Sequence, residues 1–314
     1  ELLTGTFYLL MLALGMAATL IAVIVALALG HMVPDLAAGV RRFDWYGAWL
    51  RWLGAQFPEG SFWRGRYGIA LALVVPLLVL GLFQLALDEP LLGLAGLLLD
   101  IAILFYCWGP RDLDLDVAAV LDAPDAASRR HAAARLWPPG ETTRLDGGAL
   151  VEAVFRNAQR RWFGVLFWFL LLGPVGALLY RLSVISVQRE DAALPPETVR
   201  GARGWLDLLE WPVTQLMALS LALVGNFDSV AGAWREAGVG LRSDLLGRAA
   251  RASVRSEIAE ELADYTESGI PASTALAEVF GELPELRDAM SLAWRILVLW
   301  MAAIALFVVA GWVS

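Results

Sequence analysis

Long, mostly uncharged apolar segments alternate along the chain with segments rich in arginine and acidic residues. About 20 consecutive apolar residues are enough to cross a bilayer as a helix. The segment 211–225 is the shortest here and contains polar side chains, so a re-entrant or protein-facing helix is its alternative. We predict membrane-spanning helices at about residues 7–29, 67–87, 91–107, 162–187, 211–225 and 296–313.

The distribution of arginine predicts which side of the membrane each connecting segment faces. Segments 31–66, 108–161 and 226–295 carry 20 of the 24 arginines, whereas 188–210 carries three. Because cations near the ends of spanning helices stay in the cytoplasm, we expect the three arginine-rich segments to be cytoplasmic and 188–210 to be external. This alternation requires 211–225 to cross.

The first residues differ from an ordinary start. Glu1 is not an initiator, no signal-peptide cleavage site is visible, and Met16 opens an alternative native start. We therefore interpret residues 1–15 as non-native or upstream sequence.

Apolar residues recur at helical spacing within the cytoplasmic segments. Val151, Val154 and Phe155 lie on one side of a predicted helix, and charged residues oppose an apolar stripe over 249–265. We therefore predict an all-α fold: a polytopic helical membrane protein with amphipathic cytoplasmic helices, in which residues 1–314 form a single integral membrane domain.

Composition supports the membrane assignment and excludes several chemistries. Apolar residues make up 59% of the chain and charged residues 18%, against roughly 45–50% and about 25% in soluble domains. The 24 cations are all arginine, which excludes a phosphate-loop lysine, and the net charge of −8 argues against a nucleic-acid partner. One cysteine and two distant histidines predict no disulfide and no zinc site, and we expect neither a metal nor a cofactor.

The run G-P-R-D-L-D-L-D-V at 109–117 holds the first candidate ligands. Asp112, Asp114 and Asp116 can present oxygen ligands to Mg²⁺, which also binds phosphate oxygens, and we take Arg111, Asp112 and Asp116 as candidate ligand-binding residues. The alternative, which we favour, is that Gly109-Pro110 ends a span and the aspartates cap the next helix.

Glu152 and Asn157 are the second pair of candidate ligands, since a carboxylate beside an amide can orient a polar molecule. The favoured alternative is a helix surface on which Glu152 pairs with Arg156.

Two charged residues fall inside predicted spans. An isolated charge at the centre of a span costs about 2.5–3.5 kcal/mol on insertion scales, so Asp100 and Arg181 are expected to form an intramembrane pair. An alternative that fits the sequence equally well is that the Arg181 side chain reaches the outer headgroups and Asp100 is protonated.

Four runs of residues, taken in order, resemble known families. They resemble the AmpE family and, more distantly, the CbiB/CobD family of membrane cobinamide-phosphate synthases, over most of the chain from about Met16. The runs are R-D-L-x-x-D-V at 111–117, A-A-A-R-L-W at 132–137, E-A-V-F-R-N at 152–157, and L-E-W-P-V-x-Q-L-M-A-L-x-L-A-L-V-G-N-F at 209–227.

The resemblance to the synthases has gaps at polar positions. Those proteins carry a glutamate followed five residues later by an asparagine, as Glu152 and Asn157 do here. They also carry an acidic residue before a glycine, where this chain has Phe163, and a later asparagine-and-aspartate motif, where residues 181–188 read R-L-S-V-I-S-V-Q. We therefore expect a non-catalytic relative that binds a ligand or a protein.

The AmpE resemblance implies a multi-pass protein of the bacterial inner membrane that modulates signalling. It implies roles in β-lactamase induction, the response to antibiotics and peptidoglycan recycling, beside a cytoplasmic anhydromuramyl-peptide amidase or a muropeptide-like small molecule. The alternatives are a CbiB-like membrane amide-forming synthase, with Glu152, Asn157, Asp112 and Asp116 around a metal-bound phosphate, and a small-molecule transporter.

Overall fold

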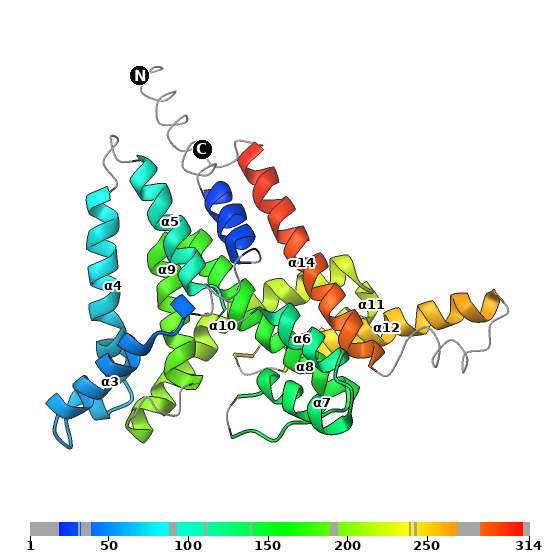
Figure 1. The fold of residues 1–314 in the computed structure, drawn as a ribbon, viewed down its shortest axis with the longest axis horizontal. Coiled ribbons are helices and arrows are strands. Elements are labelled where there is room, and N and C mark those ends of the chain that lie inside the picture. Colours follow the sequence, from blue (N-terminus) through cyan, green and yellow to red (C-terminus); the bar gives the residue numbers. More distant parts are fainter. Residues whose placement is uncertain are drawn as a thin grey trace. The chain divides into compact units, whose positions relative to one another are not determined.

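The computed structural model describes residues 19–30, 32, 39–87, 93–109, 112–138, 140–188, 194–238, 240–241, 244–268 and 283–309. Within these ranges the regular elements are helices and no strand occurs, so the predicted all-α class is confirmed (Figure 1). In the described part of the chain, four helices are long and apolar enough to cross a membrane, in agreement with a polytopic membrane protein: Gly68–Leu87, Gly147–Gln188, Pro196–Val224 and Pro284–Phe307.

The observed helices extend or shorten several predicted spans. The segment predicted at 211–225 is the second half of a longer helix, α10 (Pro196–Val224). The segment predicted at 91–107 forms α5 (Gly93–Cys107), one of the shorter apolar helices. Of the first predicted span the structure describes the helix Thr19–Gly30, and residues 1–15 lie outside the described residues.

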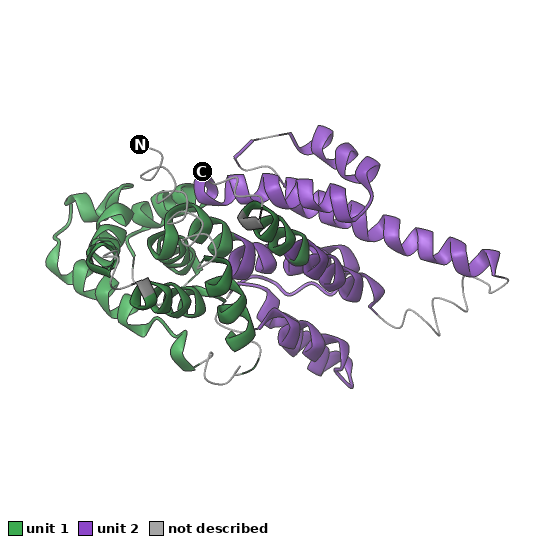
Figure 2. Ribbon diagram, turned by 90° about the horizontal axis from the view of Figure 1, so that it is seen from above, with its two compact units in different colours: residues 1–110, 164–206, 298–314 green, residues 111–163, 207–297 purple. Residues whose placement is uncertain are grey.

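Contacts divide the chain into two compact units (Figure 2). One unit comprises residues 1–110, 164–206 and 298–314, and the other comprises residues 111–163 and 207–297. Two long helices, α10 and α14 (Pro284–Val309), contribute residues to both units. The single membrane domain remains a prediction, because these units are defined by contacts and not by the bilayer.

The first unit is built around α9 (Gly164–Gln188), against which α4 (Gly68–Leu87) and α5 pack. It also contains α3 (Asp44–Gln56) and the short helix η1 (Phe62–Arg64). The outward face of α4 is strongly apolar, with side chains 57–69% exposed, as expected of a surface that faces lipid. These residues are Leu78, Val79, Leu82, Phe83 and Leu85.

The helix α9 reverses direction near its middle. Gly173 has φ +65° and ψ −153°, a conformation that favours glycine, and Pro174 follows it. A straight helix would place Gly164 and Tyr180, 16 residues apart, about 24 Å from each other. A Cβ atom on Gly164 would instead overlap the Tyr180 ring. The two halves of α9 therefore lie side by side as a helical hairpin.

This reversal bears on one prediction about topology. Thr198 Oγ1 donates hydrogen bonds to the carbonyl oxygens of Trp63, at 2.7 Å, and of Gly65, at 3.2 Å. Residues 194–203 therefore lie beside the segment that precedes α4. Because the predicted span at 162–187 folds back on itself, these contacts favour one side for 31–66 and 188–210, whereas the sequence predicts opposite sides of the membrane.

The second unit also consists of helices. It contains α6 (Leu113–Leu121), α7 (Ala126–Ala133), η3 (Ala134–Leu136), α8 (Gly147–Ala158), the π-helix η4 (Gln159–Phe163), α11 (Phe227–Ala237) and α12 (Leu245–Glu267). The apolar side predicted for the helix that contains Val151, Val154 and Phe155 is confirmed, since these three residues are buried. Helix α8 packs against α12, and α12 packs against α11.

Crowding at Gly164 provides a test of the hairpin. We expect Gly164→Ala to destabilise the detergent-solubilised protein by about 1–3 kcal/mol, because the added methyl group must displace the Tyr180 ring. Tyr180→Ala should remove much of that penalty, so the two substitutions will be non-additive in thermal unfolding. Strictly additive losses would show that the two residues are far apart and would contradict the reversal.

Candidate functional site

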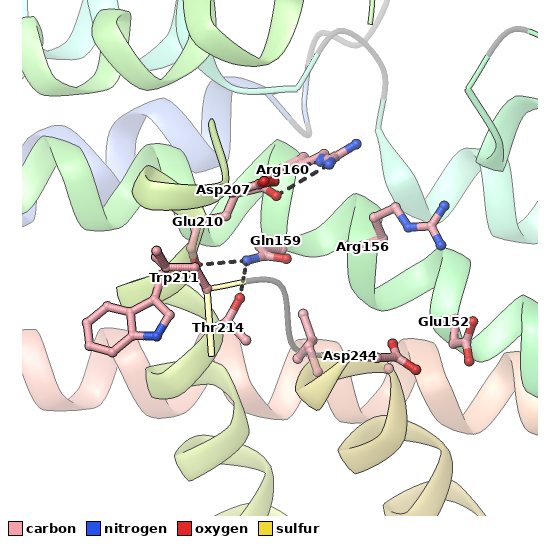
Figure 3. Close-up of a pocket in the computed structure, with 12 residues that line it drawn as sticks. Glu152, Arg156, Gln159, Arg160, Asp207, Glu210, Trp211, Thr214 and Asp244 are labelled. Atoms are coloured by element: carbon pink, nitrogen blue, oxygen red, sulfur yellow. Dashed lines mark hydrogen bonds and ion pairs between the residues drawn. The ribbon is translucent and has the colours of Figure 1, made fainter. Parts of the chain in front are cut away.

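A polar pocket of about 320 Å³ lies within the second unit (Figure 3). Its walls come from α8, the π-helix η4, the second half of α10 and the residues that lead into α12. In the close-up, Trp211 and Glu152 lie at opposite ends of the view, with Gln159 between them. The lining residues are Glu152, Arg156, Gln159, Arg160, Asp207, Glu210, Trp211, Thr214, Leu241, Asp244, Leu246 and Gly247.

Helix α8 presents Glu152 and Arg156 to the pocket. It begins after Asp146, whose Oδ1 accepts a hydrogen bond from the Ala149 backbone nitrogen at 2.9 Å. This hydrogen bond lowers the pKa of the Asp146 carboxyl. The buried residues of α8, including Leu150, hold the opposite face in the core, so the polar positions are left to face the pocket.

The π-helix η4 turns two polar side chains toward α10. Gln159 Nε2 donates to Thr214 Oγ1 at 2.8 Å and to the Glu210 carbonyl oxygen at 3.2 Å. Arg160 binds the Glu210 carboxylate through two nitrogens, with distances of 2.7 and 3.3 Å. Such paired contacts fix the orientation of a guanidinium, and π-turns are rare and often mark functional sites.

The next residue of the π-helix is anchored on another side. Arg161 Nη1 contacts Asp116 Oδ2 at 2.7 Å, and Asp116 is fully buried. Arg161 Nη2 also donates to the Arg135 carbonyl oxygen at 3.4 Å. The pair joins α6 to η4 and thereby positions Gln159 and Arg160 in the pocket wall.

Negative charge exceeds positive charge in the pocket lining, where four carboxylates face two arginines. Glu152 forms an ion pair with Arg251 of α12, and Arg251 also lies 3.6 Å from Asp244. In the described part of the chain no group of three histidine, cysteine or acidic residues is placed to hold a metal ion. The arrangement suits a ligand with an ammonium group, and Arg156 offers a contact for an anionic group.

The structure separates the residues that the sequence singled out. Glu152 lines the pocket, whereas Asn157 Nδ2 donates to the carbonyl oxygens of Leu136 and Ala153, both at 2.8 Å. Asp112 caps α6 by accepting from the Asp114 backbone nitrogen, as the favoured alternative predicted.

The remaining predicted residues do not line the pocket or lie outside the described residues. Arg111 is outside the described residues. Arg181 is buried in the first unit, with its guanidinium carbon 5.8 Å from the centre of the Phe43 ring, and its pairing with Asp100 stays a prediction.

The expected pair of Glu152 with Arg156 does not form. Glu152 binds Arg251 instead, and Arg156 lies 3.5 Å from Glu141. The long-range partner was invisible in the local spacing of α8.

Sequence reasoning missed most of the pocket. Gln159 and Arg160 stand just before an apolar segment, and Glu210 stands just before another. Polar residues at such borders are a usable signal, because they are too costly to place in lipid without a partner. Their convergence depends on tertiary contacts between distant segments, which the spacing does not encode.

Comparison with known proteins supplies the family. The family model described as "CobD/Cbib protein" matches residues 19–185. A protein of Stutzerimonas stutzeri named "Cobalamin biosynthesis protein CobD" is 33% identical over 192 residues, which is 56% of this chain and 59% of the relative. A protein of the same name from Chromobacterium violaceum is 31% identical over 185 residues, 55% of this chain and 57% of the relative.

The matched region thus spans just under three fifths of the length of these relatives. No solved structure matches the chain.

These matches correct the resemblance to AmpE. Both curated relatives and the family model point to cobalamin biosynthesis, so the AmpE assignment is wrong. The implied roles in β-lactamase induction, the response to antibiotics and peptidoglycan recycling are wrong with it. The amidase and the muropeptide-like molecule lose their basis as partners, whereas association with the lipid bilayer is supported by the apolar helices.

The buried ion pair at η4 provides a stability test. Removing one partner of a buried pair typically costs about 3–5 kcal/mol, because the other charge is left in a site that excludes water. We expect Arg161→Met to lower the thermal unfolding midpoint strongly, and the double variant Asp116→Leu with Arg161→Met to recover much of the loss. Arg144→Met removes an exposed pair and should cost at most about 1 kcal/mol. Equal effects of Arg161→Met and Arg144→Met would refute an anchoring role.

Proposed function

This chain belongs to the CobD/Cbib family, and we propose that it acts in cobalamin biosynthesis, at the amide-forming step that yields cobinamide phosphate. The observation that carries the proposal is the overlap of the family match with the pocket. The matched residues 19–185 include Glu152, Arg156, Gln159 and Arg160, which form one wall of the pocket.

The charges of the pocket support this reaction class. An amide forms when an amine nitrogen attacks an activated carboxyl carbon and displaces the activating group, so the lost carboxyl oxygen leaves as part of that phosphate-containing group. The amine must first lose a proton, which a carboxylate such as Glu152 can accept. The excess of carboxylates favours an ammonium substrate, and Arg156 provides a cation for a phosphate. Activation of the carboxyl group requires an energy-rich co-substrate, such as a nucleoside triphosphate.

The position of Phe163 does not argue against this function. Phe163 is fully buried, so its side chain packs in the core and does not line the pocket. Acidic groups reach the pocket from other segments, as Asp207, Glu210 and Asp244. These three residues follow the matched region, which makes the acidic lining partly a property of this chain's second half.

We further propose the cytoplasmic membrane as the location. Apolar helices support a membrane protein, and the concentration of arginine in connecting segments is typical of their cytoplasmic retention.

Complementation tests the proposed function directly. A bacterial strain that lacks its cobinamide-phosphate-forming protein should regain cobalamin-dependent growth when it expresses this chain. Glu152→Gln should lower the conversion measured in isolated membranes by about 100-fold, the scale of a lost proton acceptor. The same substitution at Glu267, the exposed last residue of α12, should leave the conversion unchanged.

Added cobalamin should rescue growth of every strain and thereby control for other defects. If the unmodified chain is present in the membrane but does not support growth, the proposal is refuted. Full conversion by Glu152→Gln would remove Glu152 from the reaction.

A further inference from the structure

Helix α10 has two unlike faces in its second half. At about 100° per residue, Asp207, Glu210 and Thr214 fall on one side, and they line the polar pocket. A stripe of leucine side chains, 39–67% exposed, runs along the other side. The stripe consists of Leu208, Leu216, Leu219 and Leu223, and Trp211, which lines the pocket, lies at the border of the two faces.

The beginning of α10 adjoins the segment that precedes α4. Thr198 donates to the Trp63 and Gly65 carbonyl oxygens, and a Cβ atom on Gly201 would overlap the Arg66 carbonyl group. This contact places the start of α10 on the side of the membrane from which α4 departs.

The segments that follow the end of α10 are assigned to the same side of the membrane as its start. After Val224 the chain forms α11, which packs against α12, and α12 packs against α8. Helix α8 belongs to the segment 108–161, which follows 31–66 along the chain after the two predicted crossings at 67–87 and 91–107. Both ends of α10 therefore adjoin segments that share one side of the bilayer.

We infer that α10 does not cross the membrane but lies in its cytoplasmic interface, with the apolar stripe against lipid acyl chains and glycerol groups. An amphipathic helix with large apolar side chains on one face and polar residues on the other is typical of this location. Lipid is the fitting occupant because the stripe is continuous along the helix and the same chain already contains lipid-facing helices such as α4.

Arginine counting supports the in-plane arrangement. With α9 reversing and α10 in the interface, all arginines except Arg181 lie in segments on the cytoplasmic side. A crossing α10 would put the seven arginines of 226–295 outside once α9 is a hairpin. The inference does not rest on the proposed function.

The in-plane helix also places the pocket at the membrane surface. Asp207, Glu210 and Thr214 face away from the lipid stripe, so a ligand reaches them from the aqueous side of the headgroup region.

Accessibility of single cysteines tests the sidedness. In the full chain carrying Cys107→Ser, we would introduce Arg200→Cys near the start of α10, or Glu236→Cys in α11; both native side chains are exposed. A membrane-impermeant maleimide should label both cysteines in inside-out vesicles and neither in intact spheroplasts. Labelling of either residue in intact spheroplasts overturns the inference.

Depth measurements with spin labels separate the two orientations. Leu208 and Leu223 are 15 residues apart, so a crossing helix would separate their depths by about 22 Å. In the interface, labels at these positions and at Leu219 should report depths within about one helix turn, or ~5 Å, of one another. Labels at Leu78 and Leu85 of α4 provide the control and should differ by about 10 Å. A steady depth gradient along α10 would refute the inference even if both flanking cysteines face the cytoplasm.

Discussion

The reversal of the chain at Gly173 and Pro174 is the constraint on which the arrangement of the polar segments depends. A continuous helix over 164–188 would carry the chain to the opposite membrane surface, whereas the hairpin returns it beside α4. The left-handed φ of Gly173 and the missing amide hydrogen of Pro174 make this reversal possible in an apolar segment. As a result, the start of α10 meets the residues before α4.

A second local irregularity orients the pocket. Within five residues, the π-helix η4 directs Gln159 and Arg160 to α10 and Arg161 to the buried Asp116. Each direction is stabilised by a separate set of hydrogen bonds, which together compensate for the unusual turn. The family match includes η4 but ends before α10, so the acidic side of the pocket comes from the part of the chain that the match does not cover.

Apolar periodicity predicted α4, α8 and the all-α class, because burial in lipid or in a protein core imposes a repeating pattern on these segments. The pattern could not reveal the hairpin, since Gly173-Pro174 within an apolar run reads equally well as a kinked span. The pocket could not be predicted from the pattern either, because it depends on distant contacts. Glu152, for example, binds Arg251 of α12, 99 residues away, instead of its neighbour Arg156. The motifs alone point away from the synthases because two polar motifs are absent, whereas the similarity to the family extends over 19–185.

The distance between the two arms of α9 tests the central claim most directly. Spin labels at Phe167 and Val187, on the full chain in lipid, are 20 residues apart. A continuous helix would hold their backbones about 30 Å apart. The reversal at Gly173 predicts a distance below about 20 Å, because 167 then lies opposite residues of the returning arm. A measured distance near 30 Å would contradict the hairpin and, with it, the placement of both ends of α10 on one side of the membrane.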